Sequence, residues 1–154
     1  MKVLFLDFDG VICTIRSSAA IKEHGLMTYL DPIALGLIQR VVVEYGYSVV
    51  ISSSWRHRYK KLEDFRLIFL VAGVQGIADA LHPDWCTPKF SNDGHERGYE
   101  IRDWLNAHPE VESYLIIDDE RDMLTEQMGR FVYVKSSQDG FSYANFAAAC
   151  ELSK

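Results

Sequence analysis

The chain has 154 residues, of which 48% are hydrophobic and 25% charged, and its formal net charge at pH 7 is −6. That length and composition fit one globular domain and exclude a disordered or fibrous protein, while the negative charge argues against broad binding along a nucleic acid backbone. No apolar segment approaches the roughly 20 residues that cross a bilayer, and the first residues form a strand rather than a signal peptide, so we expect a cytoplasmic protein with no membrane partner.

The first predicted element is a buried strand that begins near Val3 and ends in the run Asp7-Phe8-Asp9-Gly10. Side chains alternate along an extended chain, so Asp7 and Asp9 point roughly the same way, while Gly10 permits a sharp exit. Paired carboxylates at such a strand end suit metal and phosphate chemistry. The alternative is a simple Asx turn that leaves the strand.

Residues 12–30 show little periodicity and are interpreted as a long loop or flap. Asp31 then caps a helix that has Pro32 at its first position, carries an apolar stripe and ends at Gly46. A second apolar strand follows over residues 48–52. The chain therefore opens as strand, helix, strand.

The second half continues this alternation. We expect a helix from Leu62 to Gly73, a weak strand over 74–78, a loop over 79–95, a helix over 97–107, a strand over 114–117, a short strand over 131–134 and a helix over 143–152. This order predicts an α/β, Rossmann-like three-layer sandwich with a mainly parallel sheet of about five strands. The single domain would span residues 1–154 and carry only a minimal cap, formed by the insertions at 12–30 and 79–95.

Acidic side chains follow two of the predicted strands. Asp118 and Asp119 end the strand over 114–117, as Asp7 and Asp9 end the first. Because the carboxyl ends of parallel strands lie at one edge, these groups should converge, and the repulsion between them favours a hard cation such as Mg²⁺. The alternative for Asp118 and Asp119 is a polar turn that caps the next helix.

Donors for a phosphoryl group are predicted at the same edge. Ser52 ends the second strand, and Arg97 opens the helix that leads to the Asp118 strand. Either residue could instead have an ordinary structural role, Ser52 in a turn that starts a helix and Arg97 as a solvated surface charge.

The three cysteines, Cys13, Cys86 and Cys150, are odd in number and widely spaced. This pattern fits neither a disulfide framework nor a Cys-x-x-Cys metal site. We therefore expect reduced thiols.

Taken together, these motifs resemble those of the haloacid dehalogenase (HAD) superfamily. Asp7-Phe-Asp9-Gly10-Val11 is similar to its first motif, Ile51-Ser52 to its second, a cation before the fourth strand to its third, and Ile116-Ile117-Asp118-Asp119-x-x-Asp122 to its fourth. The runs Ser52-Ser53-Ser54-Trp55-Arg56 and Arg97-Gly98-x-Glu100-Ile101-x-x-Trp104-Leu105 further resemble the small HAD domains of Swiss-army-knife RNA-repair proteins.

The resemblance implies an Mg²⁺-dependent phosphatase. Asp7 would be the nucleophile that forms an aspartyl-phosphate, and Asp9 the acid and base, with its main-chain carbonyl helping to hold the metal. Asp118 and Asp119 would complete the metal site, and Asp122 would be a weaker ligand or lie just outside it.

The resemblance also implies which residues hold the phosphate. Ser52, or Ser53 in its place, would bind the phosphoryl oxygens, and Arg97 would neutralise their charge. The superfamily more often uses Lys at that position, which leaves Lys89 as the alternative. Arg56 is a further candidate for contact with the substrate phosphate, or a member of a surface ion pair.

With so little cap, the site should be open to a nucleotide, a phosphorylated nucleic acid end or a small phosphometabolite. Aromatic side chains in the insertions, Trp85, Phe90, Tyr29 and His24, could stack on a base or pack locally. Two other functions stay open: a receiver-like phosphoacceptor module, in which Lys135 would follow the last strand, and a catalytically silent binding domain. A receiver places its acceptor after the third strand, where Asp79 is the candidate.

Overall fold

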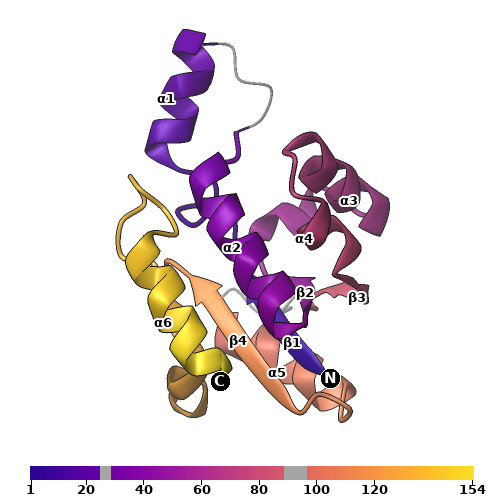
Figure 1. Cartoon of the computed structure of the whole chain (residues 1–154). Helices are drawn as coiled ribbons and strands as arrows, with labels where there is room; N and C mark the ends of the chain where they lie inside the picture. Colours follow the sequence, from indigo (N-terminus) through magenta and orange to yellow (C-terminus); the bar gives the residue numbers. More distant parts are fainter. Residues whose placement is uncertain (25–28, 89–96) are drawn as a thin grey trace.

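The computed structural model describes residues 1–24, 29–88 and 97–154, without the side chains of residues 21–24. Its centre is a five-stranded, wholly parallel sheet in the order β3-β2-β1-β4-β5 (Figure 1). The strands are β1 (Lys2–Leu6), β2 (Tyr47–Ile51), β3 (Leu81–Cys86), β4 (Ser113–Asp118) and β5 (Phe131–Tyr133). The α-helices are α1 (Ile15–His24), α2 (Pro32–Tyr45), α3 (Leu62–Val71), α4 (Gln75–Asp79), α5 (Arg97–Ala107) and α6 (Tyr143–Ser153), and the 3₁₀ helices are η1 (Ser54–His57) and η2 (Thr125–Arg130).

The predicted α/β sandwich is confirmed. Val3 and Phe5 of β1 pack with Ile101 and Trp104 of α5 on one face of the sheet. Leu4, in contrast, belongs to the larger core on the other face, which helices α2, α3, α4 and α6 cover. Successive side chains of β1 thus point alternately into the two cores. The continuous apolar runs predicted strands that are buried on both faces, and the central strands are buried in this way.

Helix α2 forms as its sequence predicts. Asp31 accepts hydrogen bonds from the backbone N–H groups of Ile33 and Ala34, Pro32 is the first helical residue, and Gly46 ends the helix with a left-handed φ of 69°. A residue with a side chain is disfavoured in that conformation, so the glycine supports the stop.

The interpretation of residues 12–30 wholly as a loop is wrong, because helix α1 occupies Ile15–His24. Thr14 and Ser17 bond reciprocally, backbone N–H to side-chain oxygen at 3.0 Å in each direction, which caps the start of the helix. Thr14-x-x-Ser17 is therefore the signal that could have identified it. Figure 1 shows α1 standing away from the sheet beyond the end of α2, so few apolar residues mark its helical period.

The prediction of a strand over 74–78 is also wrong. Residues Gln75–Asp79 form helix α4, and the third strand, β3, lies inside the stretch that was expected to be a loop. Strand β3 contains Pro83, which cannot donate to a ladder but is tolerated on an edge strand. Leu81 is its one buried residue, so β3 lacks the apolar run by which β1, β2 and β4 are found.

Among the described residues, no helix has both the length and the apolar character of a membrane span. All three cysteines lie in the described part of the chain, and none is in a disulfide.

Candidate active site

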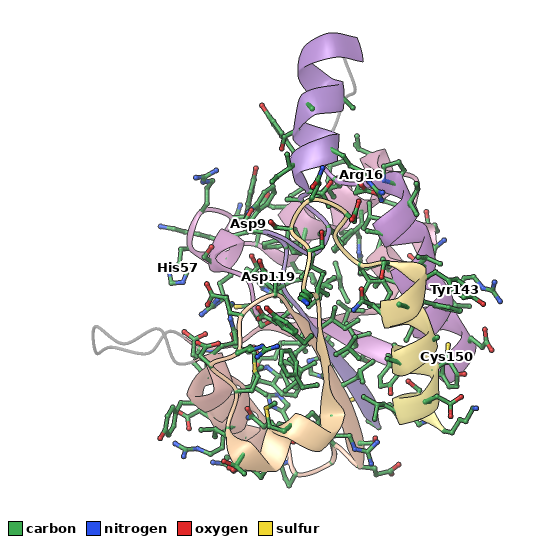
Figure 2. All side chains as sticks on the ribbon, turned by 90° about the vertical axis from the view of Figure 1, so that its left-hand side faces the viewer. Asp9, Arg16, His57, Asp119, Tyr143 and Cys150 are labelled. Carbon is green, nitrogen blue, oxygen red and sulfur yellow. The ribbon has the colours of Figure 1, made fainter. Side chains whose placement is uncertain are left out.

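Three carboxylates converge where β1 and β4 end. Strand β1 pairs with β4 so that Leu6 lies opposite Ile117, and the N–H of Asp7 donates to the carbonyl of Ile117 at 3.1 Å. Asp7, Asp118 and Asp119 each place an oxygen within 4.8 Å of the others. Figure 2 shows Asp119 close to Asp9 at this end of the sheet. The two acidic turns therefore meet, as the parallel sheet requires.

These carboxylates raise one another's pKa values. The pKa of Asp7 lies well above its usual value, chiefly because of burial and next because of Asp118, although Arg97 opposes the shift. Burial likewise raises the pKa of Asp118 to about 6, against the opposing effect of Arg97. The positive charge of Arg97 thus does not offset the burial and mutual repulsion of these carboxylates. A divalent cation between them would do so. Carboxylate oxygens are the ligands that Mg²⁺ prefers, so the residues fit such an ion.

Arg97 joins the two strand ends. Its guanidinium lies 3.2 Å from Asp7 Oδ1 and 3.3 Å from Asp118 Oδ2. The side chain is only 13% exposed, so these contacts are weakly screened. It is the cation that this structure places at the centre. Lys89, the alternative, lies outside the described residues.

The loop after β4 holds the start of α5, and with it Arg97. Asp122 Oδ2 accepts from the Arg97 N–H at 2.9 Å, and its carbonyl accepts from the Gly98 N–H at 3.2 Å. Gln127 donates to the Gly98 carbonyl at 2.8 Å. A Cβ on Gly98 would lie 2.6 Å from the Leu124 nitrogen, so only glycine allows this approach. Asp122 therefore caps α5 and so helps to position Arg97, the first residue of that helix.

Gly10 is required by the geometry of the first acidic turn. Its φ of 75° is left-handed, and a Cβ there would overlap the carboxylate of Asp119. The backbone exit after Asp9 and the approach of Asp119 thus depend on the same missing side chain.

The turn after β2 brings Ser52 and Ser53 to the same edge. The Ser52 N–H donates to the Leu6 carbonyl at 3.1 Å, and both serines are fully buried. The hydroxyl of Ser53 accepts from the N–H of Trp55 at 3.3 Å and so caps η1. The hydroxyl of Ser52, in contrast, has no hydrogen-bond partner among the described residues. Ser53 accepts in this cap and keeps its own proton to donate, so either serine can donate to a ligand, and Ser52 is the one whose hydroxyl has no other bond in the described part of the chain.

Arg56 is buried beneath this turn. It donates to the carbonyls of Ser52 and Ser53 at 2.6 and 2.8 Å, and to Glu100 at 2.6 Å. Burial lowers its pKa, and the charge of Glu100 opposes that shift. Arg56 thus links the serine turn to α5 through a buried ion pair, whereas the sequence suggested a substrate contact or a surface pair.

Trp55 contacts Asp9, and no pattern in the sequence predicts this contact. The indole N–H lies 3.2 and 3.1 Å from the two carboxylate oxygens of Asp9, which is exposed. The Trp55 ring contacts Phe8 and stacks on Tyr59, with centroids 5.1 and 5.9 Å apart. The carboxylate of Asp9 is therefore fixed by a packed aromatic side chain.

Thr87 is a second residue that sequence reasoning missed. It follows β3, its N–H donates to the Ile51 carbonyl at 3.1 Å, and its buried hydroxyl has no hydrogen-bond partner in the described part of the chain. It therefore ends the strand next to the one that Ser52 follows. Because β3 was not recognised, Thr87 could not be assigned to this edge.

The aromatic residues proposed for stacking on a base differ in their surroundings. Trp85 packs on Phe65, with ring centroids 5.0 Å apart, which is the local alternative. Tyr29 is 60% exposed. Phe90 and the side chain of His24 lie outside the described residues.

A parallel α/β sandwich with two acidic strand ends around a buried arginine is the architecture of a HAD-like protein. The chain belongs to the family of HAD domains in Swiss Army Knife RNA repair proteins, which its residues 3–146 match. Comparison with curated proteins and with solved structures gave no match. Membership of this family indicates a phosphatase-type hydrolase, a class whose members typically use a metal ion.

Proposed function

We propose that this protein hydrolyses phosphomonoesters through an aspartyl-phosphate on Asp7. The observation that carries the proposal is the position of the Asp7 carboxylate, which lies at the carboxyl end of β1, 3.2 Å from Arg97 and within 4.8 Å of Asp118 and Asp119. A nucleophilic carboxylate at that point has a cation for the phosphoryl charge and ligands for a metal beside it.

The chemistry takes two steps. Asp7 attacks phosphorus while Asp9 gives its proton to the leaving oxygen, so that one P–O bond forms and another breaks. Asp9 then removes a proton from water, which attacks the aspartyl-phosphate and releases inorganic phosphate. The exposure of Asp9 and its hydrogen bond to Trp55 suit a group that meets solvent and the leaving group.

Mg²⁺ would be held by Asp7, Asp118 and Asp119, with the main-chain carbonyl of Asp9. When bound, it neutralises charge on the carboxylates and on the phosphoryl oxygens. Ser52, whose hydroxyl has no partner within residues 1–24, 29–88 and 97–154, would donate to a phosphoryl oxygen, with Ser53 beside it, and Arg97 would balance the oxygen charges. Arg56 would act on the phosphate through the turn that it holds.

The substrate that we propose is a nucleotide, a phosphorylated nucleic acid end or a small phosphometabolite. The description of the family as RNA-repair domains supports the nucleic acid end. The stacked rings of Trp55 and Tyr59 lie beside Asp9 and so offer an aromatic surface near the leaving group that Asp9 would protonate. The receiver-like alternative has no support from β3, since the residue that follows it is Thr87 rather than an acid.

The test is phosphate release by the purified chain from an aryl phosphate, from nucleotides, from 3′- and 5′-phosphorylated oligonucleotides and from sugar phosphates. We expect turnover with Mg²⁺ that a chelator abolishes and added Mg²⁺ restores. Absence of turnover on the whole panel with Mg²⁺ would refute the proposal. A preference for sugar phosphates would refute only its nucleic acid part.

Replacing Trp55 by Phe should lower kcat about tenfold on an alkyl phosphate, because it removes the N–H that orients Asp9 but keeps an aromatic ring. An aryl phosphate, whose leaving group needs little protonation, should lose less. Steady-state kinetics on both substrates measure the difference. Tyr59→Phe, which keeps the stacked ring and alters only its hydroxyl, is the matched control. Equal losses on the two substrates would contradict a role for Trp55 in positioning the acid.

A further inference from the structure

A second group of potential metal ligands lies away from the catalytic edge. His82 in β3, and His108 and Glu110 just after α5, each place a ligand atom within 4.8 Å of the others. Helix α5 runs from Arg97 at the catalytic edge towards His108, a rise of roughly 16 Å over 11 residues. The group is therefore separate from the carboxylates of the proposed phosphatase site.

The ring of His108 is fixed and its protonation is constrained. It stacks on Trp104 with centroids 3.7 Å apart and an interplanar angle of 10°, and Trp104 is 2% exposed. Nδ1 of His108 lies 2.8 Å from the carbonyl of Trp104. A carbonyl only accepts, so Nδ1 carries the proton, and in the neutral ring the lone pair is on Nε2.

That lone pair faces a carboxylate. Nε2 of His108 lies 3.4 Å from Asp84 Oδ2. When the ring is neutral, Nε2 of His108 and Oδ2 of Asp84 are two acceptors that face each other, and a positive charge between them would stabilise the contact. Either a second proton on His108 or a metal ion supplies it. Two ligands on a tetrahedral zinc ion lie about 3.4 Å apart, given zinc–ligand distances of about 2.0–2.1 Å.

His82 is arranged to complete such a site. Its ring lies 5.4 Å from that of His108 at an interplanar angle of 85°, and 5.2 Å from Trp104. Nδ1 of His82 lies 3.2 Å from the carbonyl of Asp84. The N–H of Asp84 also donates to this Nδ1, at 3.0 Å, so Nδ1 either accepts that bond or carries the ring proton and donates to the carbonyl. Binding of a metal through Nε2 requires the second arrangement, in which the carbonyl accepts the ring proton and the bond from the Asp84 N–H is given up.

We propose that His82 and His108, with Glu110 and Asp84 as the carboxylates, form a second metal site that takes a borderline divalent cation, Zn²⁺ above Mg²⁺. Two imidazoles and a carboxylate suit zinc, whereas Mg²⁺ prefers oxygen ligands alone. The ion would tie the end of α5 to β3, and so stabilise the helix that carries Arg97.

The test compares the wild-type chain with His82→Ala, His108→Ala and His108→Gln by zinc titration calorimetry in excess Mg²⁺. His57→Ala is the matched control, because His57 is an exposed histidine of η1 that is not part of this group of ligands. Zinc bound at the catalytic carboxylates is common to all these proteins and cancels in the comparison. Circular dichroism shows whether each variant is folded.

We expect the wild type and His57→Ala to bind one more equivalent of zinc than the His82 and His108 variants. Zinc should also raise their Tm by about 5 °C more. Cobalt should give the ligand-field absorption of nitrogen ligation in the wild type and lose it in His108→Gln. Equal stoichiometry in all the proteins, or a difference that appears only at millimolar zinc, would overturn the proposal.

Discussion

Asp7→Asn is expected to lower kcat for phosphate release by at least about 10³-fold, because an amide cannot form the aspartyl-phosphate. The loss should be equally large on aryl and alkyl phosphates, since the variant lacks the nucleophile whichever group leaves. Steady-state kinetics with saturating Mg²⁺ measure it. Robust turnover by the variant would contradict the assignment of the nucleophile.

The same variant should fold at least as well as the wild type. The pKa of Asp7 is raised in the folded chain by burial and by Asp118, so its ionised form destabilises the metal-free protein at neutral pH. Replacing it by Asn should therefore leave Tm unchanged or higher in the presence of a chelator. A large fall in Tm would mean that the pairing of Asp7 with Arg97 outweighs the crowding of the carboxylates.

Asp103→Asn is the matched control for both measurements. Asp103 lies on α5, is 41% exposed and pairs only loosely with Arg102, at 3.5 Å. An exposed pair of this kind contributes little, so kcat and Tm should stay near their wild-type values. Activity lost equally in both variants would point to a general effect of the lost charge.

Asp31→Ala is expected to lower the free energy of unfolding by about 3 kcal/mol and Tm by about 8 °C. Asp31 is 2% exposed and caps α2 through the N–H groups of Ile33 and Ala34. It also accepts from the hydroxyl of Thr14 and from the guanidinium of Arg16. The substitution removes all these bonds at once. Urea unfolding followed by circular dichroism measures the change.

Ser142→Ala is the control, because Ser142 caps α6 through its hydroxyl without any ion pair. It should cost about 1 kcal/mol. A cost for Asp31→Ala no greater than this would show that the bonds to Thr14 and Arg16 contribute nothing beyond the cap.

The contribution of Asp31 should also depend on pH. Burial would raise its pKa, but the bonds from Arg16, Ala34 and Thr14 outweigh burial and lower it. A carboxyl with a lowered folded-state pKa stabilises the protein fully above its unfolded value of about 3.9 and loses that effect as pH falls through the folded value. Below pH 4 the wild type should therefore lose its advantage over Asp31→Asn, which keeps the capping oxygen.

The elements that could be predicted from the sequence are those whose local pattern agrees with their environment. β1, β2 and β4 are buried on both faces, so their apolar runs identify them. The capping residues of α2, Asp31 and Gly46, are local as well. β3 and α1 do not follow from the sequence, because a partly exposed edge strand containing Pro83 and a helix that projects from the fold carry little of that pattern.

The candidate site divides in the same way. Its acids follow strands, so the rule that parallel strands end at one edge was enough to bring Asp7 and Asp118 together. The partners of Trp55, Arg56 and Asp122 could not be predicted, because each makes its decisive contact with a residue far along the chain: Asp9, Glu100 and the N–H of Arg97.

By itself, the sequence determined the parallel α/β class, the strand ends that carry the acids and the family to which the chain belongs, because these depend on short-range periodicity and on motifs. Only the tertiary structure decided which groups are already occupied. Ser53 caps η1, while the hydroxyl of Ser52 has no partner among the residues that the structure describes. Arg56 is bound to Glu100, and Arg97 lies between Asp7 and Asp118. The physical reason is that hydrogen bonding and burial depend on neighbours that the chain brings together only when it folds.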